Sequence, residues 1–301
     1  MLRNLRGFIV FTALSLNTIF WCLPLFVLAI VKLVVPWRPF RRRITPVLMA
    51  LGENWISVNG LLFRSSGSRH WRVDEHADLH KRGWYLVLSN HQTWVDILVL
   101  QGAFNRRIPF LKFFIKRELI WIPFIGLAWW ALDMPFMKRY SPSYLAKHPE
   151  KKGTDLEATR RACEKFSDTP TSVINFVEGT RFSEEKRDKR NSPYTNLLTP
   201  RAGGIAIALS SMGELFDAVL DVTIVYPDGV PEFWDMCCGD EVKPVVEYRL
   251  RPIDEDLVTG NYEQDRDFRR SVHAWLGGLW TEKDARIDEL KGRSQLGSRV
   301  A

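Results

Sequence analysis

Short apolar runs closed by polar residues recur along the middle of the chain. The runs "WYLVLS" (84–89) and "SVINFV" (172–177) are rich in β-branched and aromatic residues, a composition and length that predict buried strands. The stretch "VLDVTIVYP" (219–227) predicts a third strand. Alternating apolar and polar positions in "KPVVEYRLRPI" (243–253) predict a fourth strand at a more peripheral place in the sheet.

Segments with a helical pattern lie between and after these runs. We expect a helix from Thr93 to Phe104, a second that begins after Pro200 and ends at Gly213, and a third within residues 267–291. Strands that alternate with helices predict an α/β domain with a mostly parallel central sheet flanked by helices. In such sheets, ligands bind beyond the carboxyl ends of the strands.

The N-terminal part of the chain has a long apolar segment. From Phe8 to Val31 there are 24 residues without a charge, and about 20 apolar residues cross a bilayer. A signal peptide fits badly, because the run is longer than a usual signal core and no small-residue cleavage site follows. Pro24 interrupts the run, so one kinked span and two short helices that enter and return both stay open. We expect a membrane-anchoring segment at 1–45 and one further domain at 46–301.

The charge of the chain favours an anionic partner. The 301 residues carry a formal charge of +7 and the sequence pI is about 9.3, which suits phospholipid headgroups or a phosphorylated substrate. No nucleic-acid-reading module is recognisable, so no nucleic-acid partner is predicted. Four cysteines without a C-x-x-C spacing predict a reducing compartment and no structural metal. The basic residues after the apolar segment place the rest of the chain on the cytoplasmic side by the positive-inside rule: Lys32, Arg38, Arg41, Arg42 and Arg43.

Candidate catalytic residues follow the first predicted strand, in "NHQTWVD" (90–96). Thr93 and Asp96 match a capping box, so Asp96 could simply cap the helix, and His91 could be a turn residue bonded to backbone. Within one helix, His91 and Asp96 would point about 140° apart and could not meet. If His91 lies in the loop and Asp96 in the first helical turn, the carboxylate can hold one ring nitrogen and leave the other as a base.

Common hydrolase and nucleotide-binding motifs do not occur in the sequence. The patterns G-x-S-x-G, H-E-x-x-H, G-x-x-x-x-G-K-[ST] and G-x-G-x-x-G are all missing, which argues against the enzyme classes that use them. A base without a protein nucleophile suits direct transfer, in which a deprotonated substrate hydroxyl attacks an activated carbonyl.

A second motif, "EGTRF" (178–182), follows the predicted strand at 172–177. It can be a solvated surface turn. Alternatively, Gly179 lets the backbone approach a ligand and Arg181 binds a phosphate group through its fork of donors.

The motifs also occur in a recognisable order. N-H-x-x-x-x-D at 90–96 is followed by "KRELIWIPFIG" (116–126), "PFMKR" (135–139), E-G-T-R at 178–181 and "VTIVYP" (222–227). This order, behind an apolar anchor, resembles the PlsC-type glycerolipid acyltransferase family over roughly residues 84 to 230. The C-terminal third and "WALDMPFMKRYS" look most similar to bacterial inner-membrane members of that family.

The resemblance implies a glycerolipid acyltransferase fold and an acyltransferase domain at 46–301. It implies transfer of a fatty acyl group from acyl-CoA or acyl-carrier protein to the free hydroxyl of a lysophospholipid, with 1-acyl-glycerol-3-phosphate as the expected acceptor and no cofactor or metal. His91 would be the general base and Asp96 its orienting partner. The residues expected to bind the acceptor are Arg139, Glu178, Gly179, Thr180 and Arg181. The family often has an acidic residue before the basic one where this chain has Lys138, which leaves the acceptor headgroup open.

The segment at 119–137 is rich in Trp and Phe. Its uncharged part is too short to span a bilayer, so it is either a buried core element or an interfacial surface that holds an acyl chain. A non-enzymatic lipid-binding or membrane-scaffold protein is the alternative function, because it would use the same anchor, basic flanks and aromatic residues.

Overall fold

The computed structural model describes residues 1–35, 37–67, 71–137, 147–148, 169–258, 260, 262 and 265–298. Its helices are α1 (Leu2–Val34), α2 (Arg38–Ser66), α3 (Val95–Phe104), α4 (Ile125–Ala131), α7 (Glu184–Lys189), α8 (Gly203–Met212), α9 (Phe233–Cys238) and α10 (Arg266–Ser298). Short 3-10 helices are η1 (Arg117–Trp121), η3 (Gly213–Leu215) and η4 (Glu255–Leu257). The strands are β1 (Arg72–Glu75), β2 (Tyr85–Ser89), β3 (Leu111–Phe113), β4 (Ile115–Lys116), β5 (Phe136–Met137), β6 (Ser172–Phe176), β7 (Ala218–Val225) and β8 (Val245–Arg251).

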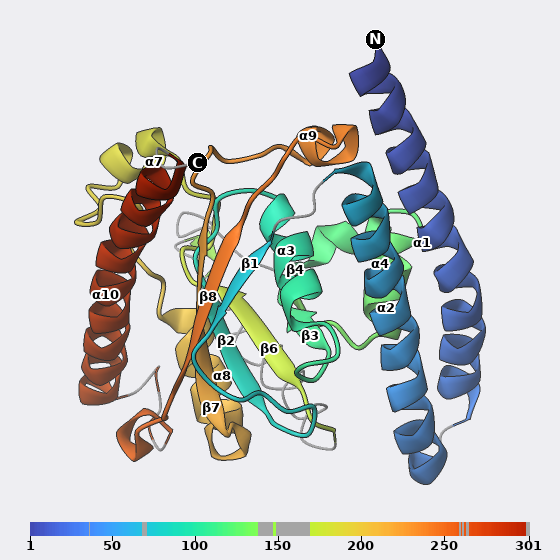
Figure 1. The fold of residues 1–301 in the computed structure, drawn as a ribbon. Helices are drawn as coiled ribbons and strands as arrows, with labels where there is room; N and C mark the ends of the chain where they lie inside the picture. The colour runs from blue at the N-terminus through green and yellow to red at the C-terminus, as the bar shows by residue number, and fades with distance from the viewer. Residues whose placement is uncertain are drawn as a thin grey trace.

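A six-stranded sheet in the order β1-β8-β7-β2-β6-β3 forms the centre of the described structure (Figure 1). Strands β3, β6, β2 and β7 run parallel to one another, whereas β8 runs antiparallel to β7 and pairs in parallel with β1. The four predicted strands and the mostly parallel sheet are therefore confirmed. The pattern missed β1 and β3, because both are short edge strands, and β1 has the polar sequence "RVDE".

Strand β2 is buried on both faces. Tyr85 and Val87 belong to the apolar core shared with α2 and α3, and Leu86 and Leu88 belong to the core shared with α8 and α10. Successive side chains of a strand point to opposite faces, so a strand between two cores is a continuous apolar run. In Figure 1, α10 covers one side of the sheet, and α3 with the α1–α2 pair covers the other.

Helix α2 was not predicted. Its buried apolar positions include Ile44, Leu48, Ile56 and Phe63, which recur at near-helical intervals along one narrow stripe. Helix α1 ends at Val34, α2 begins at Arg38, and α2 lies alongside α1 (Figure 1). The predicted boundary between residues 45 and 46 falls inside α2, and the division into an anchor and a domain stays a prediction.

Helix α1 is continuous through Pro24 and has 33 residues, so the interpretation of the apolar run itself as two short helices is wrong. Of the described helices, α1 is long and apolar enough to cross a membrane, and 22% of its most apolar 18-residue window is buried. Both ends of α1 contact the rest of the protein through ion pairs. Arg3 pairs with Asp235 of α9 and with Asp240, which follows α9, and Lys32 pairs with Asp133 after α4.

The aromatic segment at 119–137 is exposed in its first part, 121–130, and mostly buried in its second part, where Ala131, Leu132 and Met134 join the core. The side chain of Trp121 is 86% exposed and that of Leu127 is 52% exposed. The segment folds as η1 followed by α4, and a Cβ at Gly126 would lie 2.2 Å from the carbonyl oxygen of Ile120. Glycine is therefore required where the chain turns from η1 into α4.

Candidate active site

His91 lies in the loop after β2, and Asp96 lies in the first turn of α3. Nδ1 of His91 is 2.8 Å from Oδ2 of Asp96. The imidazole ring stacks on Phe176, the last residue of β6, with ring centroids 3.9 Å apart and planes 14° apart. The carboxylate and the aromatic ring together fix the imidazole, and the hydrogen bond at Nδ1 leaves Nε2 as the nitrogen that can accept a proton.

Asp96 holds the histidine and also reaches back to the backbone before α3, although Trp94, the N-cap residue of α3, makes no side-chain cap hydrogen bond. Oδ2 of Asp96 also accepts backbone N–H groups of Gln92 at 2.5 Å and Thr93 at 3.0 Å, while α3 itself begins at Val95, two residues after the expected start. The Asp96 side chain is 0% exposed, and a buried carboxylate needs donors of this kind to stay charged. The backbone-binding and orienting roles of Asp96 are therefore compatible.

The neighbouring strand β7 holds the histidine loop in place. The side-chain amide of Asn90 donates to the carbonyl of Ile224 at 2.9 Å, and its oxygen accepts the Ile224 N–H at 2.9 Å. Beyond the end of β7, the hydroxyl of Tyr226 donates to Oδ1 of Asp96 at 2.7 Å. No role for Tyr226 followed from the sequence, although this residue belongs to the "VTIVYP" run.

Glu178 joins the two predicted motifs. Its Oε1 accepts the His91 N–H at 3.1 Å and its Oε2 accepts the Leu198 N–H at 2.8 Å. In addition, the Phe182 N–H donates to the His91 carbonyl at 2.7 Å. The Glu178 side chain is 0% exposed, and burial raises its pKa to about 7. The Glu178 carboxylate thus binds backbone N–H groups of the protein. The sequence predicted that it contacts the lysophospholipid acceptor directly.

The rest of the "EGTRF" loop is more open and carries positive charge. Gly179 has a φ of +70°, in the region that favours glycine. The guanidinium of the exposed Arg181 lies 5.3 Å from the ring centre of Trp94, a cation–π arrangement. Lys186 of α7 donates to the carbonyl of Arg181 at 2.9 Å and to the hydroxyl of Thr180 at 3.4 Å. Lys186 lies beyond the "EGTRF" motif, so the sequence did not single it out.

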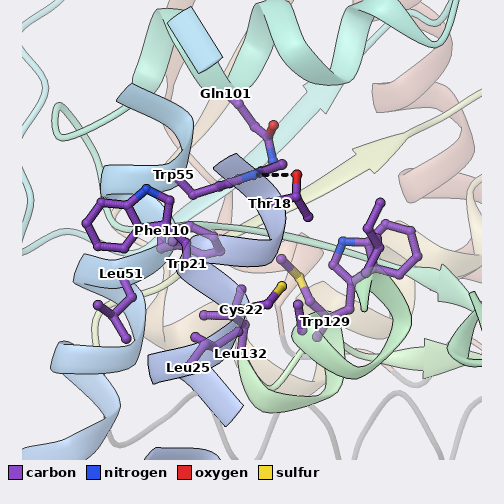
Figure 2. Close-up of a pocket in the computed structure, with 14 residues that line it drawn as sticks. Thr18, Trp21, Cys22, Leu25, Leu51, Trp55, Gln101, Phe110, Trp129 and Leu132 are labelled. Atoms are coloured by element: carbon purple, nitrogen blue, oxygen red, sulfur yellow. Dashed lines mark hydrogen bonds between the residues drawn. The ribbon is translucent and has the colours of Figure 1, made fainter. Parts of the chain in front are cut away.

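An apolar cavity begins beside Trp94. It has a volume of about 620 Å³, and α1, α2, α3, η1–α4 and Phe233 of α9 contribute to its walls. A second hollow of about 50 Å³ shares five lining residues with it: Thr18, Trp55, Gln101, Ile125 and Trp129. Figure 2 shows this second hollow, with the indole of Trp55 donating to Thr18 and with Cys22 among the residues that line it.

The predicted site residues are thus brought together in part. His91, Asp96 and the 178–181 loop lie at the carboxyl ends of β2 and β6, as predicted for ligand sites in parallel sheets. Arg139 lies outside the described residues. In the described part of the chain, no three His, Cys, Asp or Glu side chains form a group suited to a metal ion, and the absence of a cofactor stays a prediction.

Comparison with known proteins identifies the family. A family model described as "Acyltransferase" matches residues 70–227, which is more than half of the 301 residues. The chain belongs to the acyltransferase family. The chain is 27% identical over 251 residues to 1-acyl-sn-glycerol-3-phosphate acyltransferase gamma of Mus musculus, in an alignment that covers 79% of this chain and 59% of the relative.

A plant relative and a solved structure agree with this assignment. Probable 1-acyl-sn-glycerol-3-phosphate acyltransferase 5 of Arabidopsis thaliana is 27% identical over 217 residues, which are 68% of this chain and 52% of the relative. The chain therefore spans between half and three fifths of the length of these curated relatives. The crystal structure of PlsC from Thermotoga maritima matches with a TM-score of 0.54 and 17% identity, covering 96% of this chain and 98% of that chain. The predicted PlsC-type family and fold are confirmed.

Proposed function

We propose that this acyltransferase transfers a fatty acyl group from acyl-CoA or acyl-carrier protein to the free hydroxyl of a lysophospholipid, with 1-acyl-glycerol-3-phosphate as the expected acceptor. The single observation that carries the proposal is the 2.8 Å contact between Nδ1 of His91 and Oδ2 of Asp96. This pair is built on the loops where the acceptor would bind. The names of the relatives from Mus musculus and Arabidopsis thaliana support the choice of acceptor.

In the proposed reaction, Nε2 of His91 takes the proton of the acceptor hydroxyl as its oxygen attacks the thioester carbonyl. The C–O bond forms, the C–S bond breaks, and the proton passes to the leaving thiolate, so that an ester and a free thiol result. Asp96 stabilises the imidazolium that forms between the two steps. No protein nucleophile and no cofactor is needed for this balance.

The acceptor phosphate would bind at the open loop next to His91. Arg181 and Lys186 supply positive charge there. Gly179 leaves room for the side chain of Arg201, because a Cβ at position 179 would lie 3.1 Å from Cδ of Arg201. Glu178 becomes a positioning residue in this scheme, because both of its oxygens hold backbone N–H groups. Arg139 remains an expected acceptor ligand.

The cavity that begins at Trp94 would receive the acyl chain. Its volume of about 620 Å³ exceeds that of a single side chain, and each buried methylene contributes about 0.8 kcal/mol to binding. Trp94 lies three residues from His91 in the sequence, and the guanidinium of Arg181 lies over its ring. An acyl chain in the cavity and a phosphate on Arg181 would therefore both lie near the base.

We also propose that α1 lies along the membrane surface on the cytoplasmic side of a bacterial inner membrane. A helix of this length extends about 50 Å, and ion pairs tie both of its ends to the same domain. A helix that crossed the bilayer would place those ends on opposite sides. The outward face of α1 is apolar, which suits contact with the acyl chains of one leaflet, and includes Phe8, Leu16, Phe20, Leu23, Val27, Ile30 and Leu33.

The central experiment measures acyl transfer from labelled acyl-CoA and from acyl-carrier protein to 1-acyl-glycerol-3-phosphate. We expect His91→Ala to lower kcat by about 10²–10⁴-fold, the usual contribution of a general base, with an unchanged Tm. His80→Ala is the matched control, because His80 lies before β2, away from the candidate site. Wild-type protein that binds vesicles but forms no product from either donor would instead support the scaffold function.

A labelling experiment tests the membrane arrangement. Cysteines introduced by Leu2→Cys and Trp37→Cys lie near the two ends of α1. An impermeant maleimide should reach both from the cytoplasmic side and neither from the outside. Labelling of one position from each side would show a spanning helix and overturn this arrangement.

A further inference from the structure

The carboxylate that holds His91 uses both of its oxygens. Oδ2 accepts from Nδ1 of His91 and from the backbone N–H groups of Gln92 and Thr93. Among the described residues, Oδ1 of Asp96 accepts one hydrogen bond, from the hydroxyl of Tyr226 at 2.7 Å. Oδ1 is therefore held from another element of the fold, across the carboxylate from the imidazole.

Tyr226 is carried by a rigid part of the protein. It follows β7 directly, and β7 pairs with β2 in a register that places Ser89 opposite Val222. The double hydrogen bond between Asn90 and Ile224 fixes the loop of His91 to the same strand, two residues before Tyr226. The tyrosine side chain is 5% exposed, so its position is set by packing and does not depend on solvent.

We propose that Tyr226 is a positioning residue of the acyl-transfer reaction, which holds Asp96 by Oδ1 so that Oδ2 stays turned toward Nδ1 of His91. The inference rests on the proposed function for its kinetic consequences. The hydrogen-bonded series from Tyr226 through Asp96 to His91, on which the inference is built, does not depend on the substrate.

The phenol is a permanent neutral donor. Burial, together with the negative charge of Asp96, raises the pKa of Tyr226 well above its ordinary value. A neutral donor on Oδ1 withdraws charge from Oδ2 and weakens the stabilisation of a protonated imidazole. Without the phenol, the carboxylate would stabilise the imidazolium more strongly, and a higher pH would be needed to free the base.

Other charged and titratable groups face this chain from neighbouring elements and must stay constant in a test. Glu178, after β6, accepts the backbone N–H of His91. Lys283 of α10 pairs with Asp221 of β7 at 2.6 Å and donates to the carbonyl of Val222 at 2.6 Å. Arg181 lies over Trp94 on the open side. Within the described part of the chain, no hydrogen bond or ion pair joins any of these groups to the hydroxyl of Tyr226. A change at Tyr226 therefore leaves them in place.

The test uses Tyr226→Phe, which removes the hydroxyl and keeps the ring. We expect kcat with palmitoyl-CoA and 1-acyl-glycerol-3-phosphate to fall about tenfold, the effect of one hydrogen bond to a charged group, while KM stays unchanged. The acid limb of the profile of kcat/KM against pH should move to higher pH. Tyr85→Phe is the matched control, because its buried hydroxyl accepts a backbone N–H from His80 at the other end of β2, and it should change neither quantity.

A double-mutant cycle separates positioning from packing. In an Asp96→Asn background, Tyr226→Phe should have no further effect on kcat, because the interaction through which it acts is already changed. If Tyr226→Phe lowers kcat by the same factor in both backgrounds, the tyrosine acts independently of Asp96 and the inference is wrong. An unchanged kcat and pH profile in the single variant would overturn it as well.

A readout without turnover keeps this inference distinct from the proposed function. NMR of histidine-labelled protein in detergent follows the titration of the His91 ring, and in Tyr226→Phe its midpoint should move to higher pH. If wild-type protein transfers no acyl group but this midpoint moves, the proposed function fails and the positioning role stands. If wild-type protein is active and neither the midpoint nor kcat changes, the positioning role fails alone.

Discussion

In the loops after β2, β6 and β7, polar side chains are buried and bonded to defined partners, whereas α1, α2 and α4 surround the cavity mainly with apolar side chains. Asn90, Asp96 and Glu178 are each 0% exposed, and each holds backbone groups or side chains of a second element. An example of a polar contact between residues that line the cavity is the hydrogen bond from Trp55 to Thr18, drawn in Figure 2.

The difference concerns what each region can tolerate. A buried hydrogen bond depends on the position and type of single atoms, and an unpaired donor or acceptor there is costly. An apolar wall depends on volume and on the absence of charge, and volume-conserving exchanges are tolerated. We therefore expect changes of one atom to matter in the loops and only changes of volume to matter in the cavity.

The largest expected effect is that of Asp96→Asn, which keeps the shape of the side chain. We expect kcat to fall about 10²–10⁴-fold, because an amide cannot accept all the hydrogen bonds that Oδ1 and Oδ2 accept and does not stabilise an imidazolium. Steady-state kinetics and Tm measure the two consequences. Asp217→Asn is the control, since Asp217 accepts the backbone N–H of Trp84 at 2.8 Å at the far end of β2. A loss of less than tenfold in kcat would mean that Asp96 mainly holds the backbone before α3.

The next effect concerns the pH dependence of stability through Glu178. Its pKa rises from 4.5 to about 7 in the folded protein because of burial, so between these values the folded state binds more protons than the unfolded state. The free energy of unfolding therefore falls as pH rises from about 4.5 to about 7, by about 3 kcal/mol in total, and this contribution is constant at higher pH.

Glu178→Gln cannot ionise and should remove that fall in the free energy of unfolding. The variant should also be less stable at pH 5, because its amide offers one acceptor for the N–H groups of His91 and Leu198. Denaturant unfolding at pH 5 and pH 8 checks both expectations. Glu282→Gln, at an exposed carboxylate paired with Arg251, should keep the wild-type slope, and an unchanged slope in Glu178→Gln would contradict the assignment.

A smaller effect is expected from filling the cavity by Leu98→Trp. Leu98 lines the large cavity from α3. Excluding two methylenes of an acyl chain costs about 1.6 kcal/mol, so kcat/KM for palmitoyl-CoA should fall about tenfold relative to that for octanoyl-CoA. The ratio of the two rates is the measurement. Equal losses for both donors would indicate that the chain does not enter this cavity.

The smallest effect is expected at the same position from Leu98→Met. This exchange conserves volume and costs less than about 1.5 kcal/mol in stability, so the chain-length preference should stay as in the wild type. If Leu98→Met changes the preference as strongly as Leu98→Trp, the cavity depends on specific shape, and the contrast between the two regions is weaker than we infer.

The sequence predicted the main strands and the position of the site because both follow from local patterns. The run at 84–88 has no charged residue or small polar residue, since β2 has a core on each face. His91 and Asp96 could be paired from their spacing and from the start of a helix between them. The order of motifs also indicated the family, which the match to residues 70–227 confirms.

Only the tertiary structure decided what depends on contacts between distant segments. The phenol of Tyr226 is 130 residues from Asp96, and the ion pairs that hold Arg3 and Lys32 join α1 to segments more than 100 residues away. Glu178 is a buried backbone acceptor because two loops close over it, and no local pattern distinguishes that role from ligand binding. The reason is physical: periodicity records which face of an element is buried, but the partner of a polar atom is fixed by how the sheet brings the ends of its strands together.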